Sequence, residues 1–367
     1  MISLARRQSR RFFFFIVALT LVGFLIFSSA ALGLLSGGGA SYNRVVWNQF
    51  SVLILGLTGF ILLGRLPYHY WRKFAIWLLF ISFGLTLLVF IPDLGIKSGG
   101  AYRWLELGSR TFQPSELLKF SFVIYLAAWL AKIRERVITW QSGFLPFLLL
   151  IGLAGVVLIT QPDIGTFAVL FSSAIAMFFV AGAKWRQLGA LLLITGIGLT
   201  VVISINPYAR ERIFTFLNPG EKKDSSAWQI NKSLLAIGSG QLTGRGFGQS
   251  LQKFNSLPEP IGDSIFAVTA EEFGLLGSVA LIFVFTWFVF WSLRIASRAP
   301  DRFGQLLAVG LTVLLATGAF INMASMLGLL PLTGIPLLFV SHGGSALLFS
   351  LLGCGIIMNI ARSSRAN

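Results

Sequence analysis

The sequence predicts an all-α, polytopic membrane protein with about ten transmembrane helices. Of its 367 residues, 56% are hydrophobic and only 11% are charged, and mean hydropathy is +0.82. Apolar runs long enough for a helix to cross a bilayer recur along the chain. A helix pairs its backbone polar groups internally, as lipid requires. The alternating pattern of a membrane β-barrel is absent.

Ten apolar runs are the expected membrane spans. They lie at about 12–35, 47–64, 74–91, 115–131, 144–160, 165–182, 187–205, 264–293, 305–327 and 337–361. The first run is too long for a signal peptide and lacks a convincing cleavage site, so we expect a retained first helix. Without a convincing repeat or a soluble module, residues 1–367 are expected to form a single membrane domain.

Basic residues indicate the orientation. Every second segment between the runs is basic, which by the positive-inside rule places both termini in the cytoplasm. These segments hold Arg6, Arg7, Arg10 and Arg11; Arg65, Arg72 and Lys73; Lys132, Arg134 and Arg136; Lys184 and Arg186; Arg294, Arg298 and Arg302; and Arg362 and Arg365. The net charge of +16 is therefore scattered between spans, which argues against nucleic acid as a partner. The single cysteine excludes a disulfide framework.

Two outer loops depart from this charge rule. One covers residues 92–113, and the other, by far the longest, covers residues 206–263 before the eighth span. Aromatic and apolar residues along the long loop predict that it is ordered. Cations on the outer face are most simply explained by anionic ligands. The long loop carries Arg210, Arg212, Lys222, Lys223, Lys232, Arg245 and Lys253.

Two carboxylates stand where the long loop meets the eighth span. Glu259 and Asp263 are four positions apart, and Pro258 and Pro260 stiffen the approach to them. A carboxylate at the start of a membrane segment is costly to place there and marks a candidate functional site. We expect Asp263 to act as a general base, with Glu259 orienting it or replacing it.

A glycine-rich stretch at 238–248 in the same loop has two interpretations. No strand precedes it and it lies on the outer side, so the nucleotide-binding interpretation fails. The glycines serve either tight turns and close backbone approach or a backbone amide cradle for a lipid diphosphate.

Three further charged groups have both a structural and a functional interpretation. Glu116 and Lys119 are spaced i, i+3 and so share one helix face. They form either a structural ion pair or a site in which Lys119, held by Glu116, binds an anionic headgroup. Asp163 either caps the next helix or contacts substrate or a metal. Arg103 with Trp104 forms either a headgroup clamp or a membrane anchor.

Prolines and glycines around residues 330–345 predict a broken helix, which is tolerated only where protein or a cavity satisfies the backbone. Ser341 and His342 lie in this stretch. The two histidines of the chain are distant, so no zinc pattern can be built and no metal ligand set is assigned.

Together these motifs resemble the SEDS family (shape, elongation, division and sporulation), whose members include FtsW and RodA. The matching residues lie in family order over nearly the whole chain. They are Gly100-Ala101 with Arg103-Trp104, Gln113-Pro114-Ser115-Glu116-Leu117 with Lys119, Gln161-Pro162-Asp163 with Gly165-Thr166, Phe216-Leu217-Asn218-Pro219, Ile237-Gly238-Ser239-Gly240, Leu257-Pro258-Glu259, Asp263 with Ile265-Phe266-Ala267-Val268, Glu271-Glu272 with Gly274, Thr333-Gly334-Ile335-Pro336, and Ser341 with Gly343-Gly344-Ser345.

The resemblance implies ten spans and a peptidoglycan glycosyltransferase of the inner membrane that polymerises lipid II into glycan strands. It implies a class B penicillin-binding protein as partner, among other divisome or elongasome proteins. Asp263 matches the family's essential acid. The cofactor stays unknown, with a divalent cation as the candidate. Other sensitive positions of the family match Arg103, Glu116, Lys119, Asp163 and Glu259.

The chain departs from the family pattern at Gly262, where Thr is frequent, and at His342, where Tyr is common. Trp228 replaces a Tyr, and Lys232 stands where Gln is usual. Residues 251–260 look more like the division branch, represented by FtsW, than like the elongation branch.

The expected reaction is an inverting glycosyl transfer that releases undecaprenyl diphosphate, whose charge must be neutralised. Expected substrate-binding residues are Arg103, Trp104, Glu116, Lys119, Asp163, Arg210, Arg212, Lys253 and Ser341. Two rival functions are a lipid flippase, which broken helices also fit, and a scaffold that only recruits a transpeptidase. A flippase should carry charges near the mid-membrane, whereas these gather at the outer boundary.

Overall fold

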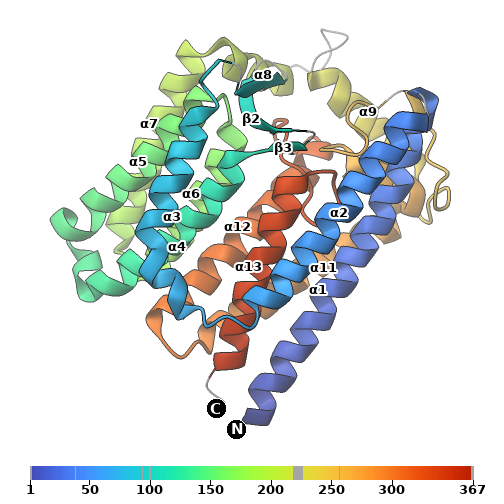
Figure 1. Cartoon of the computed structure of the whole chain (residues 1–367). Coiled ribbons are helices and arrows are strands. Elements are labelled where there is room, and N and C mark those ends of the chain that lie inside the picture. The colour runs from blue at the N-terminus through green and yellow to red at the C-terminus, as the bar shows by residue number, and fades with distance from the viewer. Residues whose placement is uncertain are drawn as a thin grey trace.

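The computed structural model describes residues 2–37, 39–92, 94–98, 101–108, 110–217, 226–255 and 257–364 (Figure 1). Of the motif and loop residues named above, Gly100, Asn218, Pro219, Lys222, Lys223 and Arg365 lie outside the described residues. The helices are α1 (Ile2–Ala31), η1 (Leu32–Gly37), α2 (Gly39–Leu63), α3 (His69–Leu88), α4 (Pro114–Ile133), η2 (Arg134–Ile138), η3 (Trp140–Phe144), α5 (Leu145–Thr160), α6 (Ile164–Val180), α7 (Trp185–Ile205), α8 (Pro207–Leu217), α9 (Ser226–Ser239), α10 (Gln252–Asn255), α11 (Ile265–Ser297), α12 (Arg302–Met326) and α13 (Gly344–Ser363).

The predicted apolar runs coincide with long helices. Within the described residues, eight helices are long and apolar enough to cross a membrane: α1, α2, α3, α5, α7, α11, α12 and α13. α6 is a shorter apolar helix, and α4 occupies the remaining predicted run. The helical membrane fold is thus confirmed, while the count of ten crossings stays a prediction.

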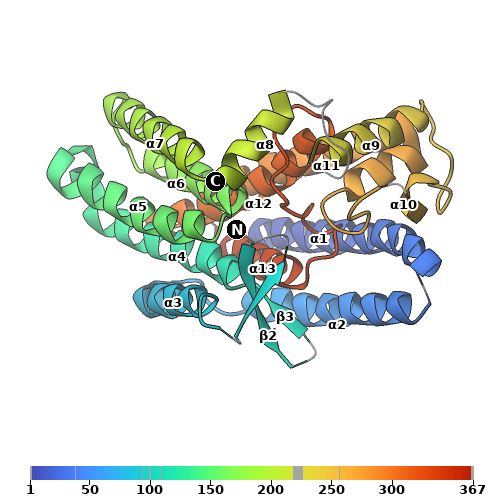
Figure 2. The same ribbon diagram turned by 90° about the horizontal axis from the view of Figure 1, so that it is seen from above.

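The helices form a bundle around α12 and α13, which are the most deeply buried of the eight spans. α12 packs against α4, α6 and α11, and α13 packs against α1 and α2. α3 packs on α4 at the edge, and α7 is the least buried span (Figure 2). The two termini lie at one end of the bundle (Figure 1). Its basic segments predict that this end faces the cytoplasm.

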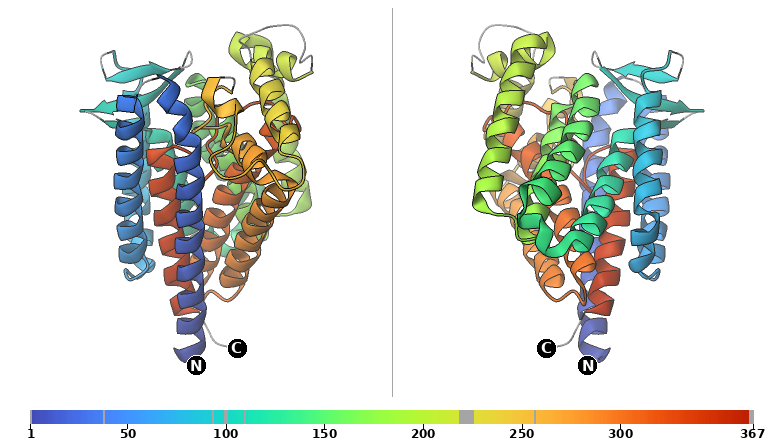
Figure 3. Two further views of the ribbon diagram at one scale, coloured as in Figure 1. Left: turned by 90° about the vertical axis from the view of Figure 1, so that its right-hand side faces the viewer. Right: turned by 90° about the vertical axis from the view of Figure 1, so that its left-hand side faces the viewer.

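The opposite end carries the two outer loops, which lie on different sides of the bundle (Figure 3). The first loop forms a small antiparallel sheet of β1 (Gly95–Ser98), β2 (Ala101–Leu107) and β3 (Arg110–Phe112), in which Leu105 pairs with both Gly95 and Phe112. The purely helical prediction missed this sheet. Its strands are too short to give a clear alternating pattern. The long loop is ordered, as predicted, in its described parts, which include α8, α9 and α10.

The glycine-rich stretch docks its backbone into a break in α11. At Gly274 the backbone leaves helical geometry, with φ 68° and ψ −164°. Leu275 N donates to Gln241 O (2.8 Å) and Leu276 N to Leu242 O (3.1 Å). In the other direction, Arg245 N donates to Glu271 O (3.0 Å). Backbone groups freed inside an apolar helix are thereby paired, as a membrane protein requires. The arrangement supports close backbone approach as the role of these glycines.

Gly274→Ala is expected to lower the free energy of unfolding by about 2 kcal/mol or more. A Cβ there requires a left-handed backbone and would meet the backbone of Leu242 and Gly244. The control is Gly152→Ala in α5, where a Cβ would meet nothing within 4 Å. That change removes a helix-interior glycine and should be neutral or slightly stabilising. Thermal unfolding of the purified proteins in detergent measures both. Equal melting temperatures for the two variants would contradict this role of Gly274.

The last span begins later than predicted. The expected run started at residue 337, but α13 starts at Gly344, and residues 328–343 are not helical. Gly334 has φ 69°, and the Ser341 hydroxyl accepts the Leu337 N–H (2.8 Å) in place of a helical carbonyl. We call residues 328–343 the broken segment. The structure confirms the broken helix expected from its prolines and glycines.

Candidate active site

The Asp263 carboxylate is half-buried at the outer end of the bundle, two residues before α11 begins. Gln229 of α9 donates from Nε2 to Asp263 Oδ1 (3.1 Å) and to Ser264 Oγ (2.9 Å). A side chain from the long loop therefore fixes one carboxylate oxygen. A backbone hydrogen bond at Asp263 also acts on this carboxylate.

The backbone around Asp263 is held from two further elements. Asn322 of α12 donates from Nδ2 to Asp263 O and to Ile335 O, both at 2.8 Å. From the broken segment, Ser341 Oγ donates to Gly262 O (2.6 Å), and the His342 N–H donates to Ile261 O (2.7 Å). The acid is therefore carried on a backbone that the bundle holds in place, which is how a preorganised site is built.

Glu259 is exposed and closes the turn that carries Asp263. Its carbonyl oxygen accepts the N–H groups of Gly262 (3.0 Å) and Ser264 (3.2 Å). Burial and, second to it, the negative charge of Glu259 raise the pKa of Asp263 from its ordinary value to about 6. The Gln229 hydrogen bond and the Arg212 charge act in the opposite direction. The result is a carboxylate that is mostly ionised at neutral pH yet more basic than an ordinary aspartate.

Arg212 of α8 is the long-loop cation whose charge acts on Asp263. It is half-buried, and its Nη1 donates to Leu332 O (2.9 Å) in the broken segment. Arg210 is exposed, because two residues of a helix differ in direction by about 200°. The structure thus places Arg212, but not Arg210, beside the acid.

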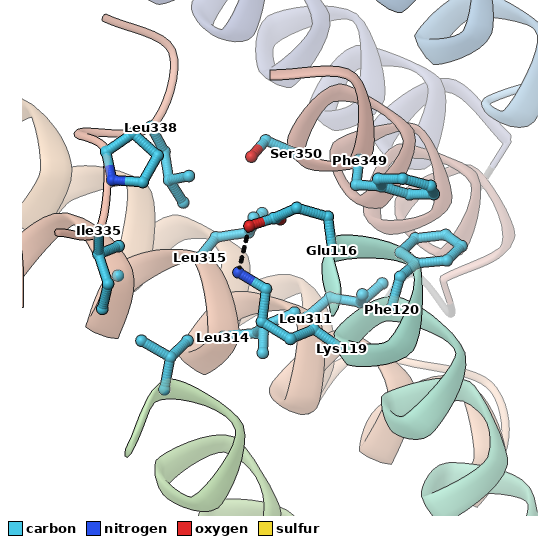
Figure 4. A pocket seen from close by; sticks show the side chains of 13 residues that line it. Glu116, Lys119, Phe120, Leu311, Leu314, Leu315, Ile335, Leu338, Phe349 and Ser350 are labelled. Carbon is cyan, nitrogen blue, oxygen red and sulfur yellow. Dashed lines mark hydrogen bonds and ion pairs between the residues drawn. The ribbon is translucent and has the colours of Figure 1, made fainter. Parts of the chain in front are cut away.

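Glu116 and Lys119 form a buried ion pair below the broken segment (Figure 4). Lys119 Nζ lies 2.8 Å from Glu116 Oε1, and each residue is 6% exposed. The pair lines a small cavity with Ile335, Pro336 and Leu338. The cavity volume is about 20 Å³, which holds about one water molecule. Because a lipid diphosphate cannot enter it, this geometry favours the structural interpretation of the pair.

Arg103 and Asp163 meet at the turn between α5 and α6. Arg103 of β2 donates from Nε to Gln161 O (3.2 Å) and from Nη2 to Pro162 O. Asp163 Oδ1 accepts the Thr166 N–H (3.2 Å), so the side chain caps α6. Among the described residues, its buried Oδ2 has no hydrogen-bond partner. Trp104 is half-buried in β2. These positions support Asp163 as a helix cap and Arg103 as a brace on that turn.

Lys253 lies in a separate buried cluster. Its Nζ contacts Glu272 Oε1 (2.7 Å), Gly248 O (2.9 Å) and Ser29 Oγ (3.3 Å), and its side chain is 0% exposed. Through these contacts Lys253 connects the long loop to Glu272 of α11 and to Ser29 of α1. The position favours a structural role over the substrate-binding role expected from the sequence.

The broken segment joins most of these groups. Arg212 reaches Leu332, Asn322 reaches Ile335, and the Glu116–Lys119 cavity lies against Pro336. At the other end of the segment, Ser341 holds the turn before Asp263. Gln229 and Asn322 were not expected as site residues. Asn322 is an amide in an apolar helix, a signal that could have been read.

Within the described residues, no three His, Cys, Asp or Glu side chains gather to hold a metal ion. Two carboxylates, Asp263 and Glu259, interact electrostatically at the site. Mg²⁺ is commonly held by one or two carboxylates together with substrate phosphates. If a divalent cation binds here, these two side chains would be its protein ligands, and a diphosphate would supply the others.

Comparison with known proteins decides the family. Residues 10–366 match the family model of FtsW, RodA and SpoVE, described as cell cycle proteins. The chain belongs to this family. It is 38% identical to a probable peptidoglycan glycosyltransferase FtsW of Geobacter sp. (strain M18), over 85% of this chain and 86% of the relative. It is 37% identical to the stage V sporulation protein E of Bacillus subtilis (strain 168), over 85% of each.

Solved structures share the fold. One chain, from a peptidoglycan synthase complex that coordinates polymerization and crosslinking, superposes with a TM-score of 0.75 at 27% identity, covering 94% of this chain and 97% of that one. The rod shape determining protein RodA of Thermus thermophilus gives a TM-score of 0.70 at 26% identity, covering 97% of each. The chain is a multi-pass membrane protein, and its relatives named FtsW agree with the division-type features predicted from residues 251–260.

Proposed function

We propose that this protein is a peptidoglycan glycosyltransferase that polymerises lipid II into glycan strands at the outer face of the cytoplasmic membrane. The observation that carries the proposal is the half-buried Asp263 carboxylate, with a pKa raised to about 6, beside Arg212 at the predicted outer end. Family membership and the glycosyltransferase names of relatives support the same activity.

In the proposed reaction, a sugar hydroxyl of an incoming lipid II attacks the anomeric carbon of the growing strand. A new C–O glycosidic bond forms on one face of the sugar, and the bond to the diphosphate oxygen breaks on the other. Asp263 accepts the hydroxyl proton as that bond forms. General bases of this kind contribute about 10²–10⁴-fold to the rate. Gln229 and Asn322 act as positioning residues, because they hold the carboxylate and its backbone.

The leaving group is undecaprenyl diphosphate, whose developing negative charge needs fixed positive charge nearby. Among the described cations, Arg212 is the candidate for this role, because its charge already acts on Asp263. Its hydrogen bond to Leu332 O fixes the guanidinium before substrate binds. Preorganised charge is effective because it needs no rearrangement during the reaction.

We also propose a class B penicillin-binding protein, a transpeptidase of the division machinery, as the partner. Among the structural relatives is a chain from a complex that both polymerises and crosslinks peptidoglycan. A polymerase that builds glycan strands at the outer face needs a crosslinking enzyme at the same place.

The deciding experiment supplies labelled lipid II to the purified protein, alone and with its cognate transpeptidase. Glycan strands of many disaccharides, resolved by gel electrophoresis, are the expected product. A preparation that moves lipid II across vesicle membranes but forms no polymer, with or without the partner, would favour the flippase alternative.

The rate of polymerisation is expected to fall below a pH of about 6, by about tenfold per pH unit, because protonation removes the base. Glu259→Gln removes the neighbouring negative charge that raises the pKa of Asp263. In that variant the acid limb of the pH–rate profile should therefore move to lower pH. Initial rates of the two proteins across the acid range measure this shift. An unmoved limb would mean that another group titrates.

A further inference from the structure

A basic cavity lies at the opposite end of the bundle, away from the candidate active site. It has a volume of about 350 Å³ and opens between the ends of three helices that are distant in sequence. Its lining consists of Arg6, Ser9, Arg10 and Phe13 of α1, Ile61 and Arg65 at the end of α2, and Met358 and Arg362 of α13.

Four arginines converge on this cavity, and its lining contains no Asp or Glu. In the described part of the chain, none of the four forms an ion pair with a carboxylate. Arg362 donates to Gly64 O (3.2 Å), and Arg10 lies 5.7 Å from the Phe14 ring centroid. Like charges gathered without a counterion repel one another, so the cavity is suited to an anion.

Part of the cavity lining is apolar. Phe13, Ile61 and Met358 line it together with the guanidinium groups. On α1, Arg6, Arg10 and Phe13 fall at helical spacings of four and three, which place them along one face. A lining that combines guanidinium groups with apolar side chains matches a molecule that is anionic at one end and apolar at the other. Guanidinium groups bind phosphate oxygens in pairs, which adds geometric fit.

We propose that this cavity binds the headgroup of an anionic phospholipid, with its acyl chains along Phe13, Ile61 and Met358. The charge pattern of the sequence places this end at the cytoplasmic surface, where anionic lipids attract basic segments. The positive-inside rule accounts for arginines at this end. It does not account for four of them, from three helices, meeting in one hollow without a carboxylate.

The test compares two double variants of the full chain. Arg6→Gln/Arg65→Gln removes two cavity arginines whose side chains make no hydrogen bond or ion pair within the described residues. The control, Arg294→Gln/Arg298→Gln, removes the same charge from exposed positions at the cytoplasmic end of α11, outside the cavity. Short-chain phosphatidylglycerol, phosphatidylcholine and inorganic phosphate are titrated into each detergent-purified protein, and bound lipid is counted by native mass spectrometry.

Phosphatidylglycerol should bind the cavity variant about 30-fold more weakly than the wild type, at ~1 kcal/mol for each basic residue lost. The control should bind it as the wild type does, and phosphatidylcholine should not distinguish the three proteins. Equal loss in the two double variants would overturn the proposal, since it would show a diffuse surface effect. Inorganic phosphate that displaces phosphatidylglycerol at similar concentration would overturn the lipid assignment in favour of a soluble anion.

Two further measurements separate loss of the lipid site from loss of folding. Arg65→Lys retains the charge and should keep most of the phosphatidylglycerol affinity. Melting temperatures in phosphatidylcholine alone should be the same for the wild type and both double variants. If the cavity variant melts at a lower temperature, phosphatidylglycerol binding is compared between the single variants Arg65→Gln and Arg65→Lys instead. Weaker binding by Arg65→Gln supports the headgroup site, because the two variants differ in charge at this position, and equal binding overturns it.

Discussion

Asp263→Asn is expected to reduce the rate of lipid II polymerisation by about 10²–10⁴-fold. The amide keeps the size of the side chain and can still accept the Gln229 hydrogen bond, so the backbone clamps from Asn322 and Ser341 should persist. What is lost is the ability to take a proton from the attacking hydroxyl. Initial rates with labelled lipid II, with the transpeptidase present, measure the effect.

The same substitution should leave the protein as stable as the wild type, or more stable, at neutral pH. Because the pKa of Asp263 is raised in the folded state, the folded protein favours the protonated acid. Its contribution to stability is therefore present at low pH and lost as pH rises through about 6. A neutral amide removes this cost. The ionised form of Asp263 therefore lowers stability, whereas the ionised form of a structural carboxylate raises it.

The matched control is Glu211→Gln, an exposed carboxylate on α8 in the same loop. It should change neither rate nor melting temperature. Normal polymerisation by well-folded Asp263→Asn protein would refute the base assignment. A rate lost equally in the Glu211→Gln protein would point to a general electrostatic effect of the loop instead.

Lys119→Met is expected to lower the free energy of unfolding by about 3–5 kcal/mol, because it leaves the Glu116 carboxylate buried without a partner. The pair lies below the broken segment, so local disorder there should also reduce activity. Thermal unfolding in detergent and the polymerisation rate are measured on the same preparation.

The double variant Glu116→Leu/Lys119→Met separates the two interpretations of this pair. Replacing a buried ion pair by apolar residues of similar size is often neutral or stabilising, so unfolding should return to near the wild-type temperature. Activity should return with it, since the cavity beside Lys119 has a volume of only about 20 Å³. A double variant that folds like the wild type but fails to polymerise would show instead that Lys119 contacts substrate.

The candidate site could be predicted in part. Asp263 and Glu259 stood out because carboxylates are rare in so apolar a chain and two of them begin a span. Arg212 stood out only as one of seven long-loop cations, and its choice over Arg210 depends on how α8 packs. Lys253 carried the same sequence signal, yet its ammonium is enclosed by Glu272, Gly248 and Ser29. Burial of that kind depends on three distant segments meeting, which a linear pattern does not reveal.

The class of fold, the approximate spans and the orientation could all be predicted from the order of residues along the chain. They follow from hydropathy and charge, because the preference of each residue for lipid or water does not depend on its tertiary neighbours. The turns of the broken segment, the amides that hold Asp263 and the docking of the glycine-rich stretch into the break in α11 emerge only in the folded protein. Those features depend on hydrogen bonds between residues far apart in the chain, such as Asn322 to both Asp263 and Ile335. Such bonds form only once packing has brought the partners within reach.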